Sequence, residues 1–464
     1  MKFTLSWLKD HLETDASLDE IAAALTDLGL EVEAVVDPAE RLGAFHIVRV
    51  LEARAHPNAD RLKVCRVETW PDGPKGAPKE IQVVCGAPNA RTDMRGVFAP
   101  DGVYVPGIDL TLKATSIRGV DSNGMLVSER ELELSDEHEG VIDLPADAPL
   151  GQRFIDYAGL ADPMIEIAIT PNRPDALGVR GIARDLAARG VGRLKDGDVA
   201  AIPGGFASPV KVRLGADVKA ESEEQGAACP YFVGRLIRGV RNGPSPDWLQ
   251  RRLKAIGLNP KNALVDVTNY ISYDRGRPLH VFDADRLSGD IEVRLAQDGE
   301  EIVALDDETY ALGAGMTLIC DGRRGGGRPV AIAGVMGGAE TGCSAATTAV
   351  FVESAYFDPV RNAATGRRLK INSDARYRFD RGVDPVFTKD GAELATAMIL
   401  EFCGGEASDL VIAGKPPKKG RNGVDRTIKL RPDRLAALVG LDIDRDEQTR
   451  ILAALGFEIS SPRG

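Results

Sequence analysis

The stretch Val330-Ala331-Ile332-Ala333-Gly334-Val335-Met336-Gly337-Gly338 places three glycines directly after a run of apolar residues. The run is typical of a buried strand, and glycines permit a tight turn and a close approach of the backbone to a ligand. Further strand-like runs lie around it at 231–236, 291–295 and 350–352, and helical stretches lie at 247–256 and 392–402. Strands mixed with helices predict an α+β domain over residues 229–405.

The N-terminal part contains two different patterns. Ser17 and Glu20 form a capping box before a helical repeat that ends at Gly29, which predicts a helix over about 18–28. Residues 45–145 instead hold short β-rich runs separated by Gly, Pro and Asn turns, at 47–51, 62–67, 81–85 and 103–105. This pattern suits an OB-fold β-barrel, the small oligonucleotide-binding kind.

After Leu150 a strand at 165–169, a turn at 170–175 and an Ala-rich helix follow, and this helix can pair with the N-terminal one. The barrel, residues 41–150, is therefore predicted as an insertion in a small N-terminal α+β domain made of residues 1–40 and 151–190.

Two segments are interpreted as linkers. Residues 191–228 are rich in Gly, Ala, Asp and Pro, with one strand expected near 210–214, and residues 406–420 end in the basic run Lys415-Pro416-Pro417-Lys418-Lys419-Gly420. Beyond them, helices are expected at 434–439 and 448–455, closed by Gly440 and Gly456, followed by strand-like residues at 457–459. We interpret residues 421–464 as the interrupted start of a small helical domain, and expect the chain to be a fragment.

Charge and cysteine content narrow the functional classes. The 70 acidic and 58 basic residues give a net charge of −12, so a nucleic-acid site has to be a local basic patch. The six cysteines include no C-x-x-C pair, which argues against a zinc knuckle and favours a reduced compartment. A charged N-terminus and the lack of a long uncharged stretch predict a cytoplasmic protein without a membrane partner.

Motifs for ATP and for a catalytic metal are missing from the sequence. There is no G-x-x-x-x-G-K-[ST], and Gly313-Ala314-Gly315 lacks the third glycine of a dinucleotide loop. The five histidines form no pair at metal-ligand spacing. We therefore expect this chain itself to hold neither ATP nor a metal ion.

Two sets of motifs carry a family resemblance. The barrel region contains, in order, His56-Pro57-Asn58-Ala59-Asp60-Arg61-Leu62, Val84-Cys85-Gly86-Ala87-Pro88-Asn89, Arg118-Gly119-Val120 and Ser122-Asn123-Gly124-Met125-Leu126. These resemble a barrel shared by several tRNA-binding proteins. The later domain adds, besides the glycine stretch, Val265-Asp266-Val267-Thr268-Asn269-Tyr270, Pro278-Leu279-His280-Val281-Phe282-Asp283, Phe351-Val352-Glu353-Ser354-Ala355 and Arg378-Phe379-Asp380-Arg381-Gly382-Val383-Asp384-Pro385. With Met1-Lys2-Phe3 and Trp7-Leu8, the whole chain resembles the bacterial phenylalanyl-tRNA synthetase beta-subunit family.

The resemblance implies a function and partners. In that family the beta subunit carries an editing site that hydrolyses mischarged Tyr-tRNA(Phe). The alpha subunit charges tRNA(Phe) with ATP and Mg²⁺, and the two form an α2β2 heterotetramer that acts on tRNA and not on DNA. The family also continues past residue 464 into further modules, and the last segment resembles the start of a helical domain related to DNA-binding folds. Two alternatives stay open: a free-standing tRNA-binding or editing protein without a synthetase partner, and a structural subunit with a decayed editing site.

The family's editing residues map onto His280, Gly337, Glu353, Ser373 and Ala375, with Thr268 and Asn269 lining the same cleft. We expect Glu353 to recognise the tyrosine side chain. Its carboxyl group can accept a hydrogen bond from the phenol hydroxyl, which phenylalanine lacks. Taken without the resemblance, Glu353 is interpreted as a solvated or ion-paired surface carboxylate.

The glycines Gly334, Gly337 and Gly338 let backbone N–H groups approach the ester carbonyl or the polar groups of tyrosine, although a plain tight turn explains them as well. No Ser-His-Asp or Cys-His set is visible, so hydrolysis by a positioned water is expected. The chain departs from the family at Ser373, where threonine is common, and at Asn259-Pro260, where arginine often precedes the proline.

Residues 361–381 hold seven basic side chains against two acidic ones. Such a patch can guide the 3′ end of tRNA to the editing site, and a solvated helix face is the alternative reading. The predicted RNA contacts are Arg367, Arg368, Lys370, Arg376 and Arg378.

Overall fold

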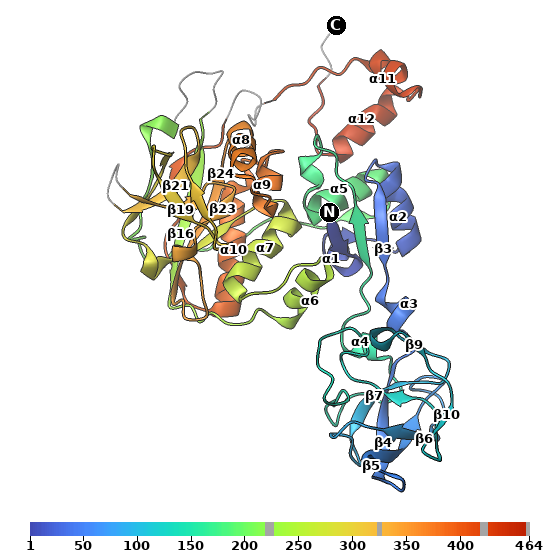
Figure 1. Cartoon of the computed structure of the whole chain (residues 1–464). Helices are drawn as coiled ribbons and strands as arrows, with labels where there is room; N and C mark the ends of the chain where they lie inside the picture. Colours follow the sequence, from blue (N-terminus) through green and yellow to red (C-terminus); the bar gives the residue numbers. More distant parts are fainter. Residues whose placement is uncertain (219–226, 323–326, 418–425, 461–464) are drawn as a thin grey trace. The chain divides into compact units, whose positions relative to one another are not determined.

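The computed structural model describes residues 1–218, 227–322, 327–417 and 426–460 (Figure 1). The chain forms two compact units: Val35–Met164 is one, and Met1–Ala34 together with Ile165–Gly464 is the other. The predicted insertion of the barrel region is therefore present. The N-terminal α+β part and the later α+β part, predicted as separate domains, belong to one unit.

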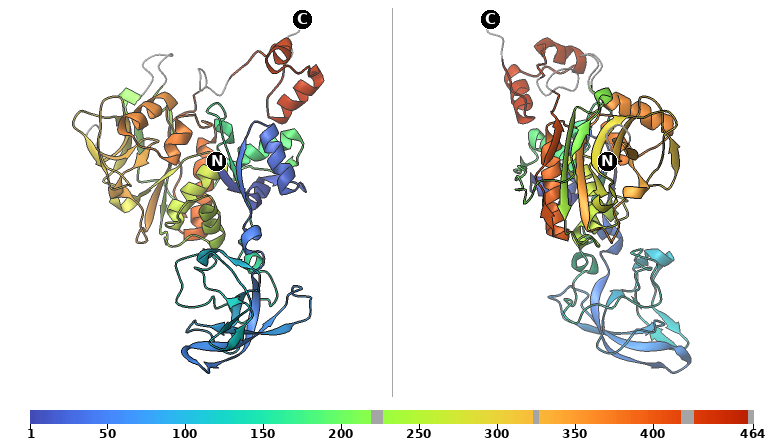
Figure 2. Two further views of the ribbon diagram at one scale, coloured as in Figure 1. Left: turned by 45° about the vertical axis from the view of Figure 1, so that its right-hand side comes forward. Right: turned by 90° about the vertical axis from the view of Figure 1, so that its left-hand side faces the viewer.

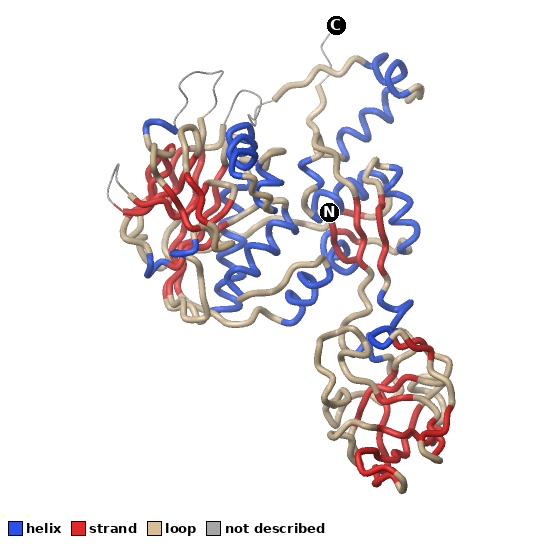
Figure 3. The backbone as a smooth tube through the Cα atoms, in the orientation of Figure 1, coloured by secondary structure: helices blue, strands red, loops and turns tan. Residues whose placement is uncertain are grey.

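The unit Val35–Met164 is built on a five-stranded antiparallel sheet. Figure 3 shows this unit as strands and loops with only short helices. The strand order is β12 (Met125–Leu126), β7 (Arg95–Ala99), β4 (His46–His56), β5 (Ala59–Thr69) and β6 (Lys79–Cys85). The flanking elements are α3 (Pro38–Leu42), α4 (Phe154–Tyr157) and the hairpins β8 (Tyr104–Val105) with β9 (Leu110–Thr111) and β10 (Thr115–Ile117) with β11 (Val120–Ser122).

The motifs of this unit meet at the β10–β11 hairpin. His56 Nε2 hydrogen-bonds the carbonyl oxygen of Ile117 (3.0 Å), and the Asn58 amide donates to the carbonyl oxygen of Arg118 (3.0 Å). The Val84 N–H donates to the hydroxyl of Ser122 (3.0 Å). His56 and Asn58 thus hold the β10–β11 hairpin in place.

The N-terminal part of the larger unit contains a three-stranded sheet with the order β1 (Lys2–Thr4), β13 (Met164–Ile167) and β3 (Val32–Val36). Helices α1 (Leu5–His11), α2 (Leu18–Asp27) and α5 (Val179–Arg189) pack together beside it. Both hydrogen bonds of the predicted capping box at Ser17 and Glu20 are present, and Gly29 follows α2 with φ +75°. The predicted helix and its pairing with α5 are confirmed.

The later part of the same unit contains two sheets. One has the order β17 (His280–Asp283), β24 (Ala349–Tyr356), β16 (Tyr231–Arg238) and β25 (Glu406–Ala407), and β26 (Val411–Gly414) also pairs with β16. The other has the order β15 (Val212–Leu214), β18 (Asp290–Leu295), β21 (Thr317–Gly322), β22 (Arg328–Ile332) and β23 (Met336–Gly337). Helices α7 (Ala263–Arg275) and α10 (Phe387–Cys403) cover the first sheet, as Figure 2 shows for α10.

Alternation along β24 sends its side chains to two different cores. Val350 and Val352 pack with α7 and α10, whereas Phe351 and Ala355 pack between the two sheets. Glu353 has the odd-numbered parity and therefore faces the space between the sheets.

Both predicted linkers contribute strands, and this corrects their assignment. The strand expected near 210–214 is β15, and it pairs in parallel with β18. In the second linker, β25 and β26 both pair with β16, and residues 418–420 lie outside the described part. Backbone groups of these segments are paired in sheets. Their Gly- and Pro-rich composition is therefore that of edge strands and not of linkers.

Two helices, α11 (Pro432–Val439) and α12 (Arg445–Ala454), lie where the sequence predicts them. Each is followed by a glycine in the left-handed region, Gly440 (φ +75°) and Gly456 (φ +89°). Residues 457–459 do not form the predicted strand. Within the described ranges, no helix has the length and apolar character to cross a membrane.

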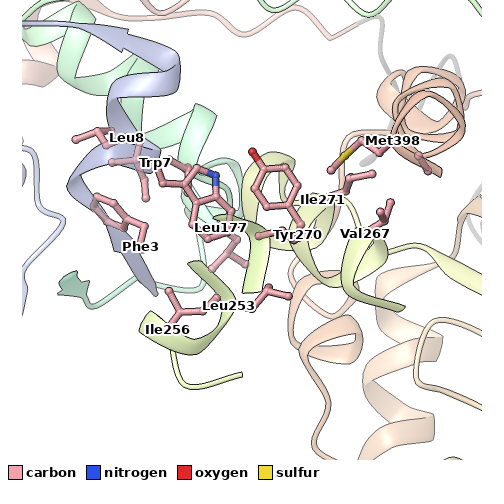
Figure 4. Close-up of a cluster of buried hydrophobic side chains, with 14 of the residues drawn as sticks. Phe3, Trp7, Leu8, Leu177, Leu253, Ile256, Val267, Tyr270, Ile271 and Met398 are labelled. Atoms are coloured by element: carbon pink, nitrogen blue, oxygen red, sulfur yellow. The ribbon is translucent and has the colours of Figure 1, made fainter. Parts of the chain in front are cut away.

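The N-terminal helix α1 docks onto α7 through an apolar cluster, shown in Figure 4, and through a buried polar network. The indole N–H of Trp7 donates to Asp274 Oδ1 (2.7 Å), and His11 Nε2 lies 2.6 Å from the same oxygen. The rings of Trp7 and Tyr270 stack with centroids 4.9 Å apart. This shared core explains why the two α+β parts form one unit, and it gives His11 a structural role.

Candidate functional site

His280 and Glu353 are direct cross-strand partners in the sheet. His280 on β17 lies opposite Glu353 on β24, and Gly234 on β16 lies opposite Glu353 from the other side. Residues paired in this way have Cβ atoms about 4.5–5.5 Å apart. The predicted pair therefore meets, with the imidazole on one side of the carboxyl group and a residue without a side chain on the other.

The Glu353 carboxyl group is buried in apolar surroundings. Only 5% of the residue is exposed, and Phe282 and Phe351 share its face of the sheet. Burial raises the pKa of Glu353 to about 8, although the nearby Arg277 guanidinium acts in the opposite direction. The surface-carboxylate reading is therefore wrong, and at neutral pH the group is largely protonated and can both donate and accept.

The His280 ring packs edge-on against Phe282 and close to Gly337. The ring centroids of His280 and Phe282 are 4.4 Å apart, and a Cβ added to Gly337 would lie 2.3 Å from His280 Cε1. His280 Nε2 is buried without a hydrogen-bond partner in the described structure. Burial lowers the pKa of His280 to about 4, so the ring is neutral at physiological pH. A neutral ring with an unused nitrogen can bind a water molecule or a ligand hydroxyl.

The glycine stretch forms the turn between β22 and β23. Gly334 has φ +66°, a left-handed conformation that favours glycine. The Gly338 N–H donates to the carbonyl oxygen of Val330 (2.8 Å), so that amide serves the fold. Close approach is needed at Gly337, next to His280, and at Gly334, next to Asn362. Gly338 packs closely on the Val330 backbone, whereas Gly334 and Gly337 admit side chains from other elements.

Ser373 links this turn to a short helix, α9 (Asp374–Phe379). Its hydroxyl donates to the carbonyl oxygen of Val335 (2.6 Å) and accepts from the Arg376 N–H (3.1 Å), which makes Ser373 the N-cap of α9. Ala375, one residue into the helix, packs against the core between the sheets. The serine supplies the cap that a threonine would also supply, so this departure from the family leaves the link intact.

Thr268 and Asn269 lie on α7, the helix that covers the opposite face of the sheet. The Thr268 hydroxyl donates to the carbonyl oxygen of Val265 (2.7 Å) within the helix. One turn later the Tyr273 hydroxyl donates to Asp374 Oδ1 (2.8 Å), beside Ser373. The structure thus brings α7 to α9, but in the described residues no hydrogen bond joins Thr268 or Asn269 to His280 or Glu353.

The basic side chains of residues 361–381 divide into two groups. Arg367, Arg368 and Lys370 are exposed at the end of α8 (Pro359–Leu369). Arg376 is bound to Asp380 (3.1 Å), and Arg378, only 2% exposed, donates to the carbonyl oxygen of Leu177 (3.3 Å) and lies over the Tyr273 ring. Burial removes Arg378 from the predicted RNA contacts, and the ion pair of Arg376 removes most of its free charge.

Sequence reasoning missed two neighbours of the carboxyl group. Arg277 is buried and donates to the carbonyl oxygen of Ala355 (2.8 Å) and to that of Asp384. Cys229 is buried, and burial followed by the nearby Glu353 raises the pKa of its thiol, so no reactive thiolate is available. Both residues are far from Glu353 in the sequence; Arg277 directly precedes the motif that begins at Pro278, and no local pattern marks Cys229.

A large cavity and the candidate site do not coincide. The cavity, of about 970 Å³, is lined mainly by segments 174–199, 275–276 and 381–390, and none of the predicted editing residues lines it. No group of three or more His, Cys, Asp and Glu side chains in the described ranges is placed to hold a metal ion. The candidate site thus consists of a buried carboxyl group, a neutral imidazole and a glycine-bearing turn.

Comparisons with known proteins give a family match for two segments of the chain. Residues 228–404 match the family model of the B3/4 domain, and residues 45–153 match the putative tRNA binding domain. The chain is 60% identical over 459 residues to the phenylalanine-tRNA ligase beta subunit of Cereibacter sphaeroides, and 56% identical over 464 residues to that of Ruegeria pomeroyi. These alignments cover 99% of this chain but 55% of each relative, so the chain spans about half the length of the curated relatives it matches.

One solved structure is an N-terminal fragment of the phenylalanyl-tRNA synthetase beta subunit from Pyrococcus horikoshii. It is 16% identical, with a TM-score of 0.29, over 66% of this chain and 80% of that one.

Proposed function

The chain belongs to the phenylalanine-tRNA ligase beta-subunit family, and from this premise we propose that it edits. It hydrolyses mischarged Tyr-tRNA(Phe) at the His280–Glu353 pair. In the complete enzyme, an α2β2 heterotetramer in the cytoplasm, it supports the charging of tRNA(Phe) by the alpha subunit. The observation that carries the proposal is the buried Glu353 carboxyl group, placed directly across the sheet from a neutral imidazole whose Nε2 is buried without a hydrogen-bond partner in the described structure.

The apolar surroundings of Glu353 suit the selection of tyrosine. An apolar pocket alone rejects a substrate with one added hydroxyl by only about 10²-fold, so charging of tyrosine needs correction. A buried polar group reverses the preference, because leaving it unpaired costs about 1–3 kcal/mol. A phenol satisfies the Glu353 carboxyl group, and the phenyl ring of phenylalanine leaves it unpaired. Phe282 and Phe351 provide apolar surface for either ring.

Hydrolysis here uses a water molecule held by His280. A base with a pKa of about 4 removes protons poorly at neutral pH, so His280 orients the water or the tRNA end through Nε2 and does not act as a strong base. Backbone N–H groups near Gly334 and Gly337 are the donors for the ester oxygen. The thiol of Cys229, with its raised pKa, is no competing nucleophile.

Contacts with tRNA(Phe) are assigned to two places. The unit Val35–Met164 matches the tRNA-binding family model, and we infer that its sheet is an OB-type barrel. The exposed Arg367, Arg368 and Lys370 lie on α8, whose N-terminal end follows β24 of the editing sheet, and they guide the 3′ end. ATP and Mg²⁺ serve charging in the whole enzyme. Neither DNA nor a membrane is a proposed partner.

Deacylation by the purified chain tests the proposal. It is expected to release tyrosine from Tyr-tRNA(Phe) faster than phenylalanine from Phe-tRNA(Phe), and to show no ATP–pyrophosphate exchange, because charging belongs to the alpha subunit. Equal release of both amino acids at the uncatalysed rate would favour the structural subunit with a decayed site. Exchange by the chain alone would show that the division of labour between the subunits is wrong.

A further inference from the structure

Asn362 on α8 is the one described residue whose side-chain oxygen and nitrogen are both buried and both without a hydrogen-bond partner. The residue is 4% exposed. A buried amide without partners costs free energy, and such groups in folded proteins normally meet a ligand or an ordered water. Because both atoms lack partners, the conclusion does not depend on which of them is the oxygen.

The Asn362 amide lies against the glycine turn of the candidate site. A Cβ added to Gly334 would lie 2.3 Å from Asn362 Nδ2, and 2.9 and 3.0 Å from the rings of Phe357 and Phe379. Any other residue at Gly334 would therefore collide with the amide. Gly334 thus keeps the backbone next to a polar group that nothing else in the described structure engages.

The same turn meets the second unpartnered group three residues later. Gly337 lies against His280, whose Nε2 is buried without a partner, and three residues span at most about 10 Å. Ser373 ties the middle of the turn to α9 through the Val335 carbonyl oxygen. The turn therefore has the unpaired Asn362 amide near Gly334 and the unpaired His280 Nε2 near Gly337. The Glu353 carboxyl group lies beside His280.

We propose that Asn362 binds the α-amino and carbonyl groups of the aminoacyl ester. An amide offers one acceptor and two donor hydrogens, and the ester head offers the matching pair, an amine donor and a carbonyl acceptor. Asn362 holds the part that every aminoacyl ester has in common, while Glu353 reads the phenol. This assignment rests on the proposed editing function, because it takes the turn 334–338 to line the substrate site.

Binding of two small probes to the complete chain tests the assignment. L-Tyrosine methyl ester carries the amine, the carbonyl and the phenol, whereas p-cresol carries only the phenol. Leucine has the shape of asparagine without its polar atoms, so Asn362→Leu is expected to weaken ester binding about 10- to 100-fold in a calorimetric titration. It should leave p-cresol binding unchanged and keep or raise the Tm, because an unpaired buried amide is removed.

The outcomes separate this assignment from the editing function. Unchanged ester affinity in Asn362→Leu would overturn it, as would an equal loss of affinity for both probes with a lower Tm, which marks a structural residue. Ester binding that depends on Asn362 in a chain that deacylates no Tyr-tRNA(Phe) would support the assignment and overturn only the hydrolysis. Normal deacylation kinetics, KM included, in Asn362→Leu would overturn only the assignment.

Discussion

At the scale of single residues, the ionisation of Glu353 makes the free energy of unfolding depend on pH. Its pKa is about 8 in the folded chain against an ordinary 4.5, so the folded state holds a proton that the unfolded chain loses between these values. The contribution of Glu353 to the free energy of unfolding is therefore largest below about pH 4.5. This contribution falls as pH rises toward 8. The full loss is about 3 to 5 kcal/mol.

Glu353→Gln, which cannot ionise, should escape this loss. We expect its Tm to match wild type near pH 4.5 and to exceed it at pH 8 to 9, with the exposed Glu301→Gln as a control that follows wild type at every pH. Thermal unfolding across this pH range measures both. Parallel Tm curves for Glu353→Gln and Glu301→Gln would contradict a buried, protonated Glu353.

Gly337 leaves room for the His280 ring because it has no side chain. In Gly337→Ala the new methyl group would overlap the imidazole ring, so the ring has to move, at a cost of about 1–3 kcal/mol. Gly243→Ala is a matched control, because a Cβ there meets nothing within 4 Å and neither glycine has a positive φ. We expect slower deacylation and a lower Tm for Gly337→Ala alone. The same result for both alanine variants would show that the contact with His280 is irrelevant.

The sequence predicted which residues form the site better than it predicted their state. The resemblance placed His280 and Glu353 together, and the strand register does so. Their pKa values depend on burial between two sheets, and the contacts of Asn362 and Arg277 join segments far apart in the chain. No local pattern encodes either property, so both required the structure.

At the scale of elements, the exposed basic side chains near the candidate site lie at the end of α8. Arg367, Arg368 and Lys370 are exposed, while Arg376 and Arg378 serve the packing of α9. Each phosphate contact releases counterions, so a loss of such contacts reduces the dependence of binding on salt.

Replacing Arg367, Arg368 and Lys370 by alanine should weaken tRNA-dependent deacylation and flatten its salt dependence. The control removes three exposed positive charges elsewhere, in and after α6 (Asp247–Ala255), by replacing Arg251, Lys254 and Lys261. Rates measured between low and physiological salt give the slopes. A slope for the α8 variant equal to that of the control variant would make the end of α8 a solvated face only.

Helices and strands with a strong local pattern were predicted, and those stabilised by distant partners were not. The capping box of α2 and the strand-like runs of β4, β5 and β16 carry their signals in the sequence itself. The short strands β15, β25 and β26 lie in Gly- and Pro-rich segments, and only pairing with β18 or β16 makes them strands. Tertiary pairing overrides local propensity there.

At the scale of the whole molecule, the insertion could be predicted and the docking of α1 could not. The matching α+β patterns on both sides of the barrel region indicated that it is inserted. Trp7 and His11, however, meet Asp274 across more than 260 residues of sequence, and this buried network merges two predicted domains into one unit. The candidate site therefore belongs to a unit whose core includes the N-terminal helix.

The central claim is that Glu353 selects the phenol while His280 positions the attacking water. The most direct test measures deacylation of Tyr-tRNA(Phe) and Phe-tRNA(Phe) by the wild-type chain, Glu353→Ala and His280→Ala. Glu353→Ala should lower the preference for Tyr-tRNA(Phe) by about 10-fold or more, since one buried hydrogen bond is lost. His280→Ala should slow both reactions by about 10²-fold with the preference retained. Wild-type rates and preference in both variants would contradict the account.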